Sequence, residues 1–408
     1  MKAPEKIAIL KNRRVLLGVT GSIAAYKAAE LASKLTQAGA VVDVILSDAA
    51  KKFVTPLTFQ SVTGRSAFTD EDLWGGEAHV LHVGLSHQAE IFLIAPATAN
   101  TIAKLAHGQA DTLLTITALA TRSALLIAPA MDAGMFEHPA MQANLETLRG
   151  RGATVVGPAE GRMASGLIGL GRMVEPDELV GHIRLALGRA GPLAGRKLVV
   201  TAGGTYEPID PVRVIANRSS GKQGFAMAQA ALDRGARVIL IAGPTALKTP
   251  MGAERIDVET AEQMRQAVLA AIEDADGLVM AAAVADFKPL QTVEHKIKRA
   301  TGSMDLRLEP TQDILAEVSK SQASKQRHPV VVGFAAESKD LTVNAREKLR
   351  AKGLSLIVAN DITASDSGFA VDTNRVTILD AGGGIQELPL MSKVEVAEAV
   401  MERVIGLL

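Results

Sequence analysis

The sequence contains no cysteine and few aromatic residues. Among its 408 residues, Phe, Trp and Tyr together make up 3%. The absence of cysteine excludes a disulfide framework, a thiolate metal site, an iron–sulfur cluster and a cysteine nucleophile. Because aromatic residues are scarce and 36 residues are glycine, the core must consist of Ala, Val, Leu and Ile. That composition suits helices packed closely on a parallel sheet.

An excess of charge is absent too. The 44 Lys and Arg residues balance the 44 Asp and Glu residues, so the net charge is +0. A binder of nucleic acid or of membrane surfaces draws its affinity from clustered positive charge, and we expect neither partner here. The longest nearly apolar stretch, 112–131, carries Arg122 at its middle, and the start of the chain lacks a signal-type apolar core. We expect a cytoplasmic protein without a membrane span.

The order of elements predicts an α/β fold with two doubly wound, Rossmann-like domains. Gly and Pro cluster at 188–196, so we expect one domain over 1–190 and a second domain over 191–408. Short β-branched runs mark the predicted strands, which are 14–19, 41–46, 91–95, 125–128, 154–156, 197–201, 238–241, 278–280, 330–332 and 356–358.

Each predicted domain has a Gly/Ser turn between a strand and a helix. Gly21-Ser22 and Ser220-Gly221 occupy similar places, although any two strand–turn–helix units share such spacing, and this is no sequence repeat. Helix N-termini favour anions, so each domain is expected to bind a nucleotide-like ligand. Neither GxGxxG nor GxxxxGK[ST] marks these turns, which argues against an NAD(P) oxidoreductase or a P-loop protein.

Three histidines, His79, His82 and His87, lie close together in the first domain. No carboxylate cluster accompanies them, so a metal site is poorly supported. His82 acting alone as an acid or base is the better interpretation, and the other two suit a surface loop.

In the second domain, the segment Asn217–Lys222 (NRSSGK) opens a helix with two hydroxyls, a glycine and a lysine, which suits a phosphate. Asp286 and Lys296 follow the strand at 278–280, and Phe334 ends a later strand. Lysines that face phosphates and acids that can hold Mg²⁺ are the parts that nucleotidyl chemistry requires. Each also has a structural interpretation, because exposed lysines are usually only solvated.

Ordered motifs carry a resemblance to two enzyme families. TGSIAAYK (20–27), HVGL (82–85), APATAN (95–100) and PAMD (129–132) resemble the flavin-dependent cysteine decarboxylases. TAGGTYEPIDPVR, NRSSGKQGFA, AAAVADF, KIK, GFAAES, AREKLRAKG and VAND resemble the phosphopantothenate–cysteine ligases. Together they cover the chain from about Val15 onward, and the whole resembles the bifunctional bacterial family of coenzyme A biosynthesis.

For the second domain, the resemblance implies activation of 4′-phosphopantothenate by CTP and Mg²⁺ to an acyl-cytidylate, followed by attack of the cysteine amine. Asn217 would hold the acyl intermediate, and Lys296 would act on the CTP phosphates. Ser219, Ser220, Gly221 and Lys222 are the expected phosphate-binding residues. The expected nucleotide-binding residues are Ala281, Ala282, Ala283, Asp286, Lys296, Asp313, Ile314, Phe334, Lys348 and Lys352. No metal ligands can be named.

For the first domain, the resemblance implies FMN-dependent decarboxylation of phosphopantothenoylcysteine to 4′-phosphopantetheine, through oxidation of the thiol and loss of CO₂ from a thioaldehyde. His82 matches the catalytic histidine, since thiol oxidation needs a base that titrates near neutral pH. The expected FMN-binding residues are Gly21, Ser22, Ile23, Ser47, Pro96, Thr98, Asn100 and Thr115.

Two positions depart from the family pattern. Asp132 stands where the family has an asparagine that contacts the substrate carboxylate, and an ionised aspartate would repel that group unless a proton is shared. Ser165 stands where the family often has the cysteine that protonates the enethiol, and a serine is a much weaker acid. Both are counted as candidate catalytic residues. We expect decarboxylation still to proceed, with another proton donor in place of the cysteine, because the glycines of the flap and Arg172 remain.

The departures leave an alternative open: an active ligase whose first domain binds FMN only as an assembly scaffold. The resemblance also implies homo-oligomers, with trimeric flavin domains, dimeric ligase domains and active sites formed across subunits. The expected partners are the small-molecule substrates.

Overall fold

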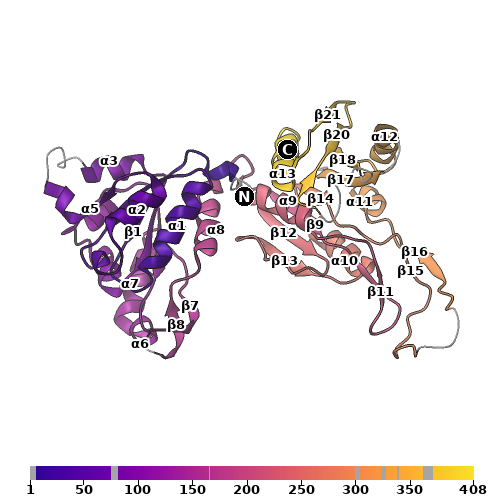
Figure 1. Cartoon of the computed structure of the whole chain (residues 1–408). Helices are drawn as coiled ribbons and strands as arrows, with labels where there is room; N and C mark the ends of the chain where they lie inside the picture. Colours follow the sequence, from indigo (N-terminus) through magenta and orange to yellow (C-terminus); the bar gives the residue numbers. More distant parts are fainter. Residues whose placement is uncertain are drawn as a thin grey trace. The chain divides into compact units, whose positions relative to one another are not determined.

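The computed structural model describes residues 6–74, 81–164, 166–298, 304–322, 328–337, 340–361 and 371–408. By its internal contacts the chain divides into two compact units, unit 1 (Met1–Leu187) and unit 2 (Gly188–Leu408). Figure 1 shows that each unit has a sheet with helices against it. The predicted boundary at 190/191 falls in the loop just beyond this division.

Unit 1 is built on a six-stranded parallel sheet in the order β3-β2-β1-β4-β5-β6. The strand order reverses between β1 and β4, so the loops at their carboxyl ends diverge and leave a crevice. The strands are β1 (Arg14–Val19), β2 (Val41–Leu46), β3 (Ala67–Phe68), β4 (Ile91–Ala97), β5 (Ala124–Pro129) and β6 (Thr154–Val155).

Helices cover both faces of this sheet, as the alternation of its side chains requires. Val15 and Leu17 belong to the core on one face, whereas Leu16 belongs to the core on the other. The first face is covered by α1 (Ala25–Gln37), α2 (Pro56–Thr63) and α8 (Pro176–Gly188). The second is covered by α3 (Leu81–Gln88), α4 (Ala99–His107), α5 (Leu113–Ala120) and α7 (Pro139–Gly150). The doubly wound prediction is confirmed.

Short elements complete unit 1. The 3₁₀ turns are η1 (Ala8–Leu10), η2 (Ala50–Lys52) and η3 (Asp70–Trp74). Helix α6 (Ala133–Glu137) follows β5, and an antiparallel hairpin of β7 (Ala159–Arg162) and β8 (Ile168–Arg172) follows β6.

Unit 2 has an eight-stranded sheet in the order β13-β12-β9-β14-β17-β18-β20-β21. The first six strands are parallel, and β20 and β21 extend one edge antiparallel. The strands are β9 (Lys197–Ala202), β12 (Arg237–Ala242), β13 (Glu254–Asp257), β14 (Gly277–Met280), β17 (Val330–Glu337), β18 (Leu356–Asp361), β20 (Val376–Asp380) and β21 (Ile385–Glu387). The antiparallel edge was not predicted.

Helices again lie on both faces of the unit 2 sheet. One face packs against α10 (Ala261–Ala271), α11 (Ile314–Gln322) and α12 (Leu341–Ala351). On the other, α9 (Lys222–Leu232) contacts β9, β12 and β14, and α13 (Lys393–Ile405) packs on α9. The small hairpin of β19 (Thr373–Asn374) and β22 (Met391–Ser392) precedes α13.

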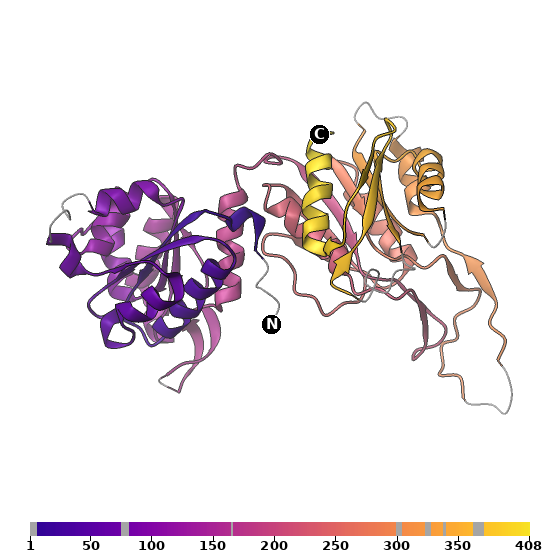
Figure 2. The same cartoon turned by 45° about the horizontal axis from the view of Figure 1, so that its top comes forward.

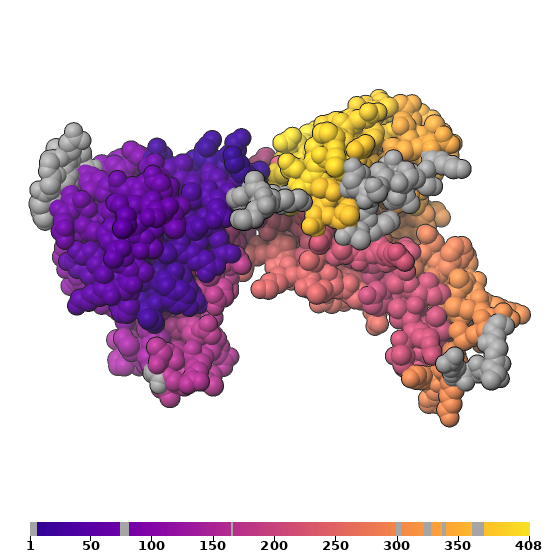
Figure 3. Space-filling view, in the orientation of Figure 1, coloured from indigo at the N-terminus to yellow at the C-terminus, as the bar shows by residue number. Residues whose placement is uncertain are grey.

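An arm projects from unit 2, and Figures 2 and 3 show its two parts in pink and in orange. It is made of two antiparallel pairs, β10 (Tyr206–Pro208) with β11 (Val214–Ala216) and β15 (Phe287–Pro289) with β16 (Leu308–Pro310). The arm places residues after β14 away from the sheet, which bears on the position of Lys296.

Candidate active sites

The carboxyl ends of the unit 1 strands surround a cavity of about 530 Å³. This volume lies within the roughly 300–1,000 Å³ typical of ligand sites. Predicted FMN-binding residues that line it are Gly21, Ser22, Ser47, Thr98, Asn100 and Thr115. Asp48, Asp70 and Lys104 are among its other lining residues.

The buried hydroxyl of Thr20 joins the two strand ends beside this cavity. Its Oγ1 donates to the carbonyl oxygen of Pro96 at 2.7 Å and accepts the N–H of Thr98 at 3.0 Å. Thr98 in turn caps α4, because its side chain accepts the N–H of Thr101. Pro96 therefore acts through its backbone in positioning the loop, and its side chain does not line the cavity.

Gly21 is required where the loops after β1 and β2 meet. A Cβ built on Gly21 would lie 2.4 Å from the Cβ of Ala49, closer than side chains tolerate. The glycine thus allows the two loops to approach closely at the cavity wall, and its contact with a phosphate stays a prediction.

Four predicted residues of unit 1 are not among those that line the cavity. These residues are Ile23, His82, Pro96 and Asp132. Ile23, which precedes α1, is 60% exposed. Ser165 lies outside the described residues, as does His79.

His82 lies on α3 and is half-buried. Its Nδ1 is buried and has no hydrogen-bond partner among the residues that the structure describes. A buried nitrogen without a partner is costly in a purely structural residue, so this geometry is compatible with a role toward a ligand. His87 lies on the same helix rather than in a loop, and it is exposed.

Asp132 is the N-cap of α6, where its Oδ1 accepts the N–H of Gly134 at 3.1 Å. The β7–β8 hairpin, which corresponds to the expected flap, packs against the same loop: Met131 N–H donates to the carbonyl oxygen of Gly171 at 3.0 Å. A Cβ on Gly171 would lie 2.2 Å from the Met131 carbonyl oxygen. The glycines of this hairpin therefore allow it to lie directly on the Asp132 loop.

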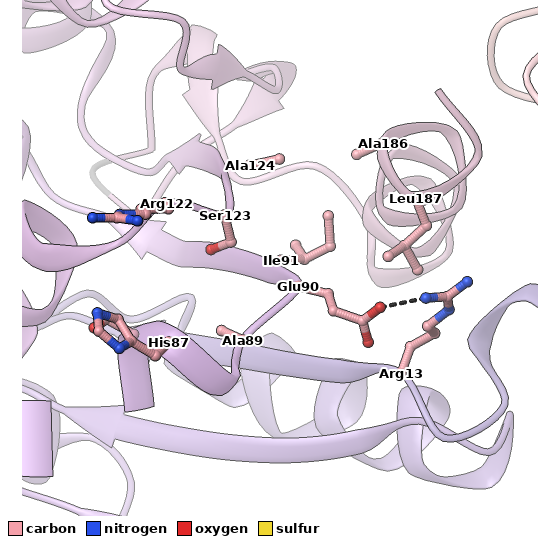
Figure 4. A pocket seen from close by; sticks show the side chains of 11 residues that line it. Arg13, His87, Ala89, Glu90, Ile91, Arg122, Ser123, Ala124, Ala186 and Leu187 are labelled. Atoms are coloured by element: carbon pink, nitrogen blue, oxygen red, sulfur yellow. Dashed lines mark hydrogen bonds and ion pairs between the residues drawn. The ribbon is translucent and has the colours of Figure 1, made fainter. Parts of the chain in front are cut away.

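A second cavity of unit 1, of about 590 Å³, lies at the opposite ends of the strands. Figure 4 shows Arg13 and Glu90 pointing toward one another there, with Arg122 and His87 farther along the wall. None of the predicted site residues lines it, and ligands of doubly wound sheets bind at the carboxyl ends.

In unit 2 a cavity of about 550 Å³ lies at the carboxyl ends of β14, β17 and β18. It collects residues from segments far apart in the sequence. Predicted residues that line it are Asn217, Ser219, Ser220, Gly221, Lys222, Ala281, Ala282, Ala283, Asp286, Asp313, Ile314, Phe334, Lys348 and Lys352. Lys296 is the one predicted nucleotide-binding residue absent from its wall.

Threonine hydroxyls hold the Ala281–Asp286 wall in place, and sequence reasoning missed them. Thr201 Oγ1 accepts the N–H of Ala282 at 3.1 Å, and the buried Thr205 Oγ1 accepts the N–H of Ala285 at 2.9 Å. Thr311 Oγ1 donates to the carbonyl oxygen of Ala285 at 2.6 Å. Thr201 and Thr205 belong to the TAGGT motif, in which the sequence prediction relied on the glycines and not on the threonines.

Lysines dominate the charge of the unit 2 cavity. Lys222, Lys348, Lys352 and Lys393 line it. Lys352 Nζ lies 3.1 Å from Asp313 Oδ2, and Lys222 Nζ lies 2.5 Å from Asp372 Oδ1. Lys393 and Asn374, which also line the cavity, had no signal in the sequence.

Lys296 is exposed on the arm, and its neighbour Ile297 is fastened by the buried Asp210. Ile297 N–H donates to Asp210 Oδ2 at 3.1 Å, and Arg213 donates to the Ile297 carbonyl oxygen at 3.3 Å. Burial alone would raise the pKa of Asp210, but backbone N–H groups of Val212, Ile297 and Arg213 and the Arg213 guanidinium lower it to about 2. Asp210 thus fixes the KIK segment on the arm.

Within the described residues, no group of three or more His, Asp or Glu side chains could hold a metal ion. The helices of those same residues include none long and apolar enough to cross a membrane.

Known protein families match the chain over both units. A model of the flavoprotein family matches residues 5–188, and one of the DNA/pantothenate metabolism flavoprotein C-terminal domain matches residues 193–407. The coenzyme A biosynthesis bifunctional protein CoaBC of Bacillus subtilis is 45% identical over 98% of both chains. The chain belongs to the family of bifunctional coenzyme A biosynthesis proteins. The CoaBC protein of Mycobacterium tuberculosis is 44% identical to this chain over 97% of both chains.

Solved structures match single units. A crystal structure of the C-terminal domain of a CoaBC protein is 36% identical and covers 53% of this chain and 97% of its own, with a TM-score of 0.45. The FMN-binding protein AtHal3 is 32% identical and covers 43% of this chain and 96% of its own, with a TM-score of 0.39.

Proposed function

We propose that the chain makes 4′-phosphopantetheine in two steps, ligating 4′-phosphopantothenate to cysteine in unit 2 and decarboxylating the product in unit 1. Family membership over nearly the whole chain supports both activities. The observation that carries the ligase assignment is the unit 2 cavity, in which lysines and a Ser-Ser-Gly helix start converge from distant segments.

In unit 2, the carboxylate of 4′-phosphopantothenate attacks the α-phosphate of CTP and releases pyrophosphate. Lys222, Lys348 and Lys352 offset the charge of the phosphates, and the N-terminus of α9 receives one of them through its free N–H groups. Asn217 lines the same cavity, and its Nδ2 donates to the Val284 carbonyl oxygen at 2.9 Å. Its remaining amide oxygen is available to the acyl intermediate.

We assign Mg²⁺ to the nucleotide rather than to a protein cage. Mg²⁺ retains several waters and is usually held by one or two carboxylates together with substrate phosphates. Asp286 and Asp313 are the carboxylates of the predicted set in the cavity wall, and Asp313 already pairs with Lys352. Asp286 is therefore the candidate protein ligand.

In unit 1, the residues present fit FMN. Gly21 opens the wall to close approach, and Ser22, Ser47, Thr98, Asn100 and Thr115 offer hydroxyl and amide groups suited to a phosphate and a polyol. Bound flavin supplies two-electron redox chemistry to this site. The chain's own contribution is the imidazole of His82, a base that can accept a proton from the substrate thiol.

We further propose that the active protein is a homo-oligomer, with trimeric flavin units and dimeric ligase units. His82 and Lys296 stand outside the cavities of their own units, which supports sites completed by a neighbouring copy. Exposed apolar side chains near the unit 1 site, including Ile23 and Tyr26, each 60% exposed, would be covered by such a neighbour.

The alternative, an active ligase with a non-catalytic FMN-binding unit, draws on Asp132 and Ser165. The geometry at Asp132 weakens it, because Asp and Asn supply the same cap oxygen to Gly134 and the substitution leaves the loop intact.

One reaction separates the possibilities: purified protein, kept anaerobic, with 4′-phosphopantothenate, cysteine, CTP and Mg²⁺, followed by mass spectrometry. Formation of 4′-phosphopantetheine supports both activities. Accumulation of phosphopantothenoylcysteine supports the scaffold alternative. If no CTP-dependent product forms, the ligase proposal is wrong.

A further inference from the structure

One charged side chain is buried on α1, the helix that begins beside the unit 1 cavity. Lys27 lies in the first turn of α1 and is 6% exposed. Its Nζ donates to the backbone carbonyl oxygen of Met173 at 3.1 Å and to Glu175 Oε1 at 2.7 Å. A buried ammonium is costly unless it is paired and hydrogen-bonded, and a cation in the first turn opposes the helix dipole. Both acceptors directly follow β8, so Lys27 joins α1 to the base of the β7–β8 hairpin.

The carboxylate of Glu175 extends this connection across the hairpin. Arg172, the last residue of β8, has its Nη2 3.4 Å from the same Oε1 that Lys27 contacts. The Arg172 guanidinium lies against Gly161 of β7, where a Cβ would be 2.7 Å from Nη1. Lys27 is therefore connected, through one carboxylate oxygen, to both strands of the hairpin.

Apolar packing also holds the base of the hairpin, but it does not fix a direction. Met173 and Val174 are buried in the core of unit 1, whereas Ile168 on β8 is 75% exposed. Hydrophobic contacts are non-directional, while a hydrogen bond weakens steeply when its angle changes. The contacts of Lys27 are therefore suited to set the direction in which the hairpin leaves the core.

The hairpin in turn contacts the wall of the unit 1 cavity. The carbonyl oxygen of Gly171 on β8 accepts the N–H of Met131, and Met131 lines the cavity. Gly21 and Ser22, which precede α1, line the same cavity. Two parts of the cavity wall are thus linked by a chain of contacts that runs from α1 through Lys27 and the hairpin.

We propose that Lys27 is a positioning residue for decarboxylation in unit 1, because it holds the β7–β8 hairpin and, through it, the loop of Met131 and Asp132. Lys27 does not line the cavity, so it acts through Glu175 and Met173 rather than on substrate or flavin. The inference rests on the proposed function of unit 1. Asp132 corresponds to the family residue that contacts the substrate carboxylate, so a displaced hairpin should weaken substrate binding and leave flavin binding unchanged.

Hydrogen–deuterium exchange of the full chain measures the hold on the hairpin independently of activity. For Lys27→Met we expect the backbone amides of 159–172 to exchange about tenfold faster, the effect of losing a hydrogen bond from a charged donor. The amides of β1 and β4 should exchange as in the wild type. Lys34→Met is the matched control, because Lys34 lies on the same helix and its ion pair with Asp177 of α8, at 2.8 Å, is exposed on both sides.

Kinetics separate positioning from a loss of folded protein. In Lys27→Met the KM for phosphopantothenoylcysteine should rise about tenfold, while the flavin content and the release of pyrophosphate from CTP in unit 2 stay unchanged. Glu175→Gln keeps an oxygen that can accept from Lys27, so its KM should lie between those of the wild type and Lys27→Met. The Glu175 side chain is 63% exposed, so this variant provides the test if Lys27→Met does not fold.

Three results would overturn the proposal. In Lys27→Met the hairpin amides could exchange as in the wild type, the amides of β1 could accelerate as much as those of the hairpin, or kcat could fall with an unchanged KM. Failure of the wild-type protein to release CO₂ from phosphopantothenoylcysteine would instead refute the decarboxylase function of unit 1. The exchange rates of the hairpin in Lys27→Met would still show whether Lys27 holds it.

Discussion

Units 1 and 2 share one topology and differ in how they surround a ligand. Counted along each unit, the parallel strands of both follow the order 3-2-1-4-5-6. In unit 1 the first strand leads within a short turn, Thr20–Ala24, into α1. In unit 2 the β10–β11 hairpin is inserted between β9 and α9, and the hairpin forms part of the arm.

The two cavities also differ in charge. The unit 1 cavity is lined by hydroxyl and amide side chains together with Asp48 and Asp70, and its lysine, Lys104, pairs with Asp111 at 2.7 Å. The unit 2 cavity has four lysines in its wall. A common sheet thus provides the crevice in both units, while the loops decide the charge of its wall and so the number of phosphates that it suits.

The largest effect is expected from a substitution at Gly21, which should impair the site of unit 1 and leave unit 2 unaffected. In Gly21→Ala the new Cβ would meet Ala49, and relieving such overpacking costs about 1–3 kcal/mol. We expect FMN affinity to fall roughly tenfold to hundredfold, measured by flavin absorbance of the purified protein, with pyrophosphate release unchanged. Gly150→Ala, whose Cβ would meet nothing within 4 Å, is the control. A parallel loss in both units would contradict the independence of the two sites.

The opposite result is expected for Lys348→Met, which should impair the site of unit 2 and leave unit 1 unaffected. Removing a charged donor from the phosphate site should raise the KM for CTP about tenfold, with FMN content unchanged. Lys320→Met, an exposed lysine of α11 outside the cavity wall, should leave both readouts as they are. An unchanged KM for CTP would remove Lys348 from the nucleotide site.

A smaller, pH-dependent effect is expected in the arm. The pKa of Asp210 is about 2 in the folded protein against an ordinary value of 3.8. Its contribution is therefore fully present above pH 4 and is lost as the pH falls toward 2. Asp210→Asn should lower the Tm at pH 7, and its Tm should approach that of the wild type as the pH falls through this window.

Glu254→Gln is the control for Asp210, because its ion pair with Arg237 is exposed on both sides and such pairs contribute about 0–1 kcal/mol. A difference between Asp210→Asn and the wild type that stays constant from pH 7 to pH 3 would show that Asp210 does not act through its charge.

The smallest effect is predicted for Asp132→Asn. Asn and Asp are equivalent N-caps, so the Tm should stay within about 1 °C, the shift expected for a few tenths of a kcal/mol. Decarboxylation should be equal or faster, since a carboxylate that would repel the substrate is removed. CO₂ release measured side by side would decide; a slower variant would show that the Asp132 charge takes part in the reaction.

Local patterns in the sequence were enough for the fold class. Strand 14–19 and strand 41–46 were predicted at the bounds that the structure has, because short, mainly apolar runs that contain Val and are bounded by turn residues have few other solutions. The β20–β21 edge was missed, since a short antiparallel addition depends on pairing with β18 rather than on any local signal.

By itself, the sequence determined the two doubly wound units and the residues that motifs place at strand ends, such as Gly21 and Ala281. Only the tertiary structure decided which of them meet. It left His82 and Lys296 outside the cavities of their units and brought in Thr205, Asn374 and Lys393. The physical reason is that strand ends and caps are set by neighbours in the chain, whereas the wall of a cavity forms only when distant segments pack together.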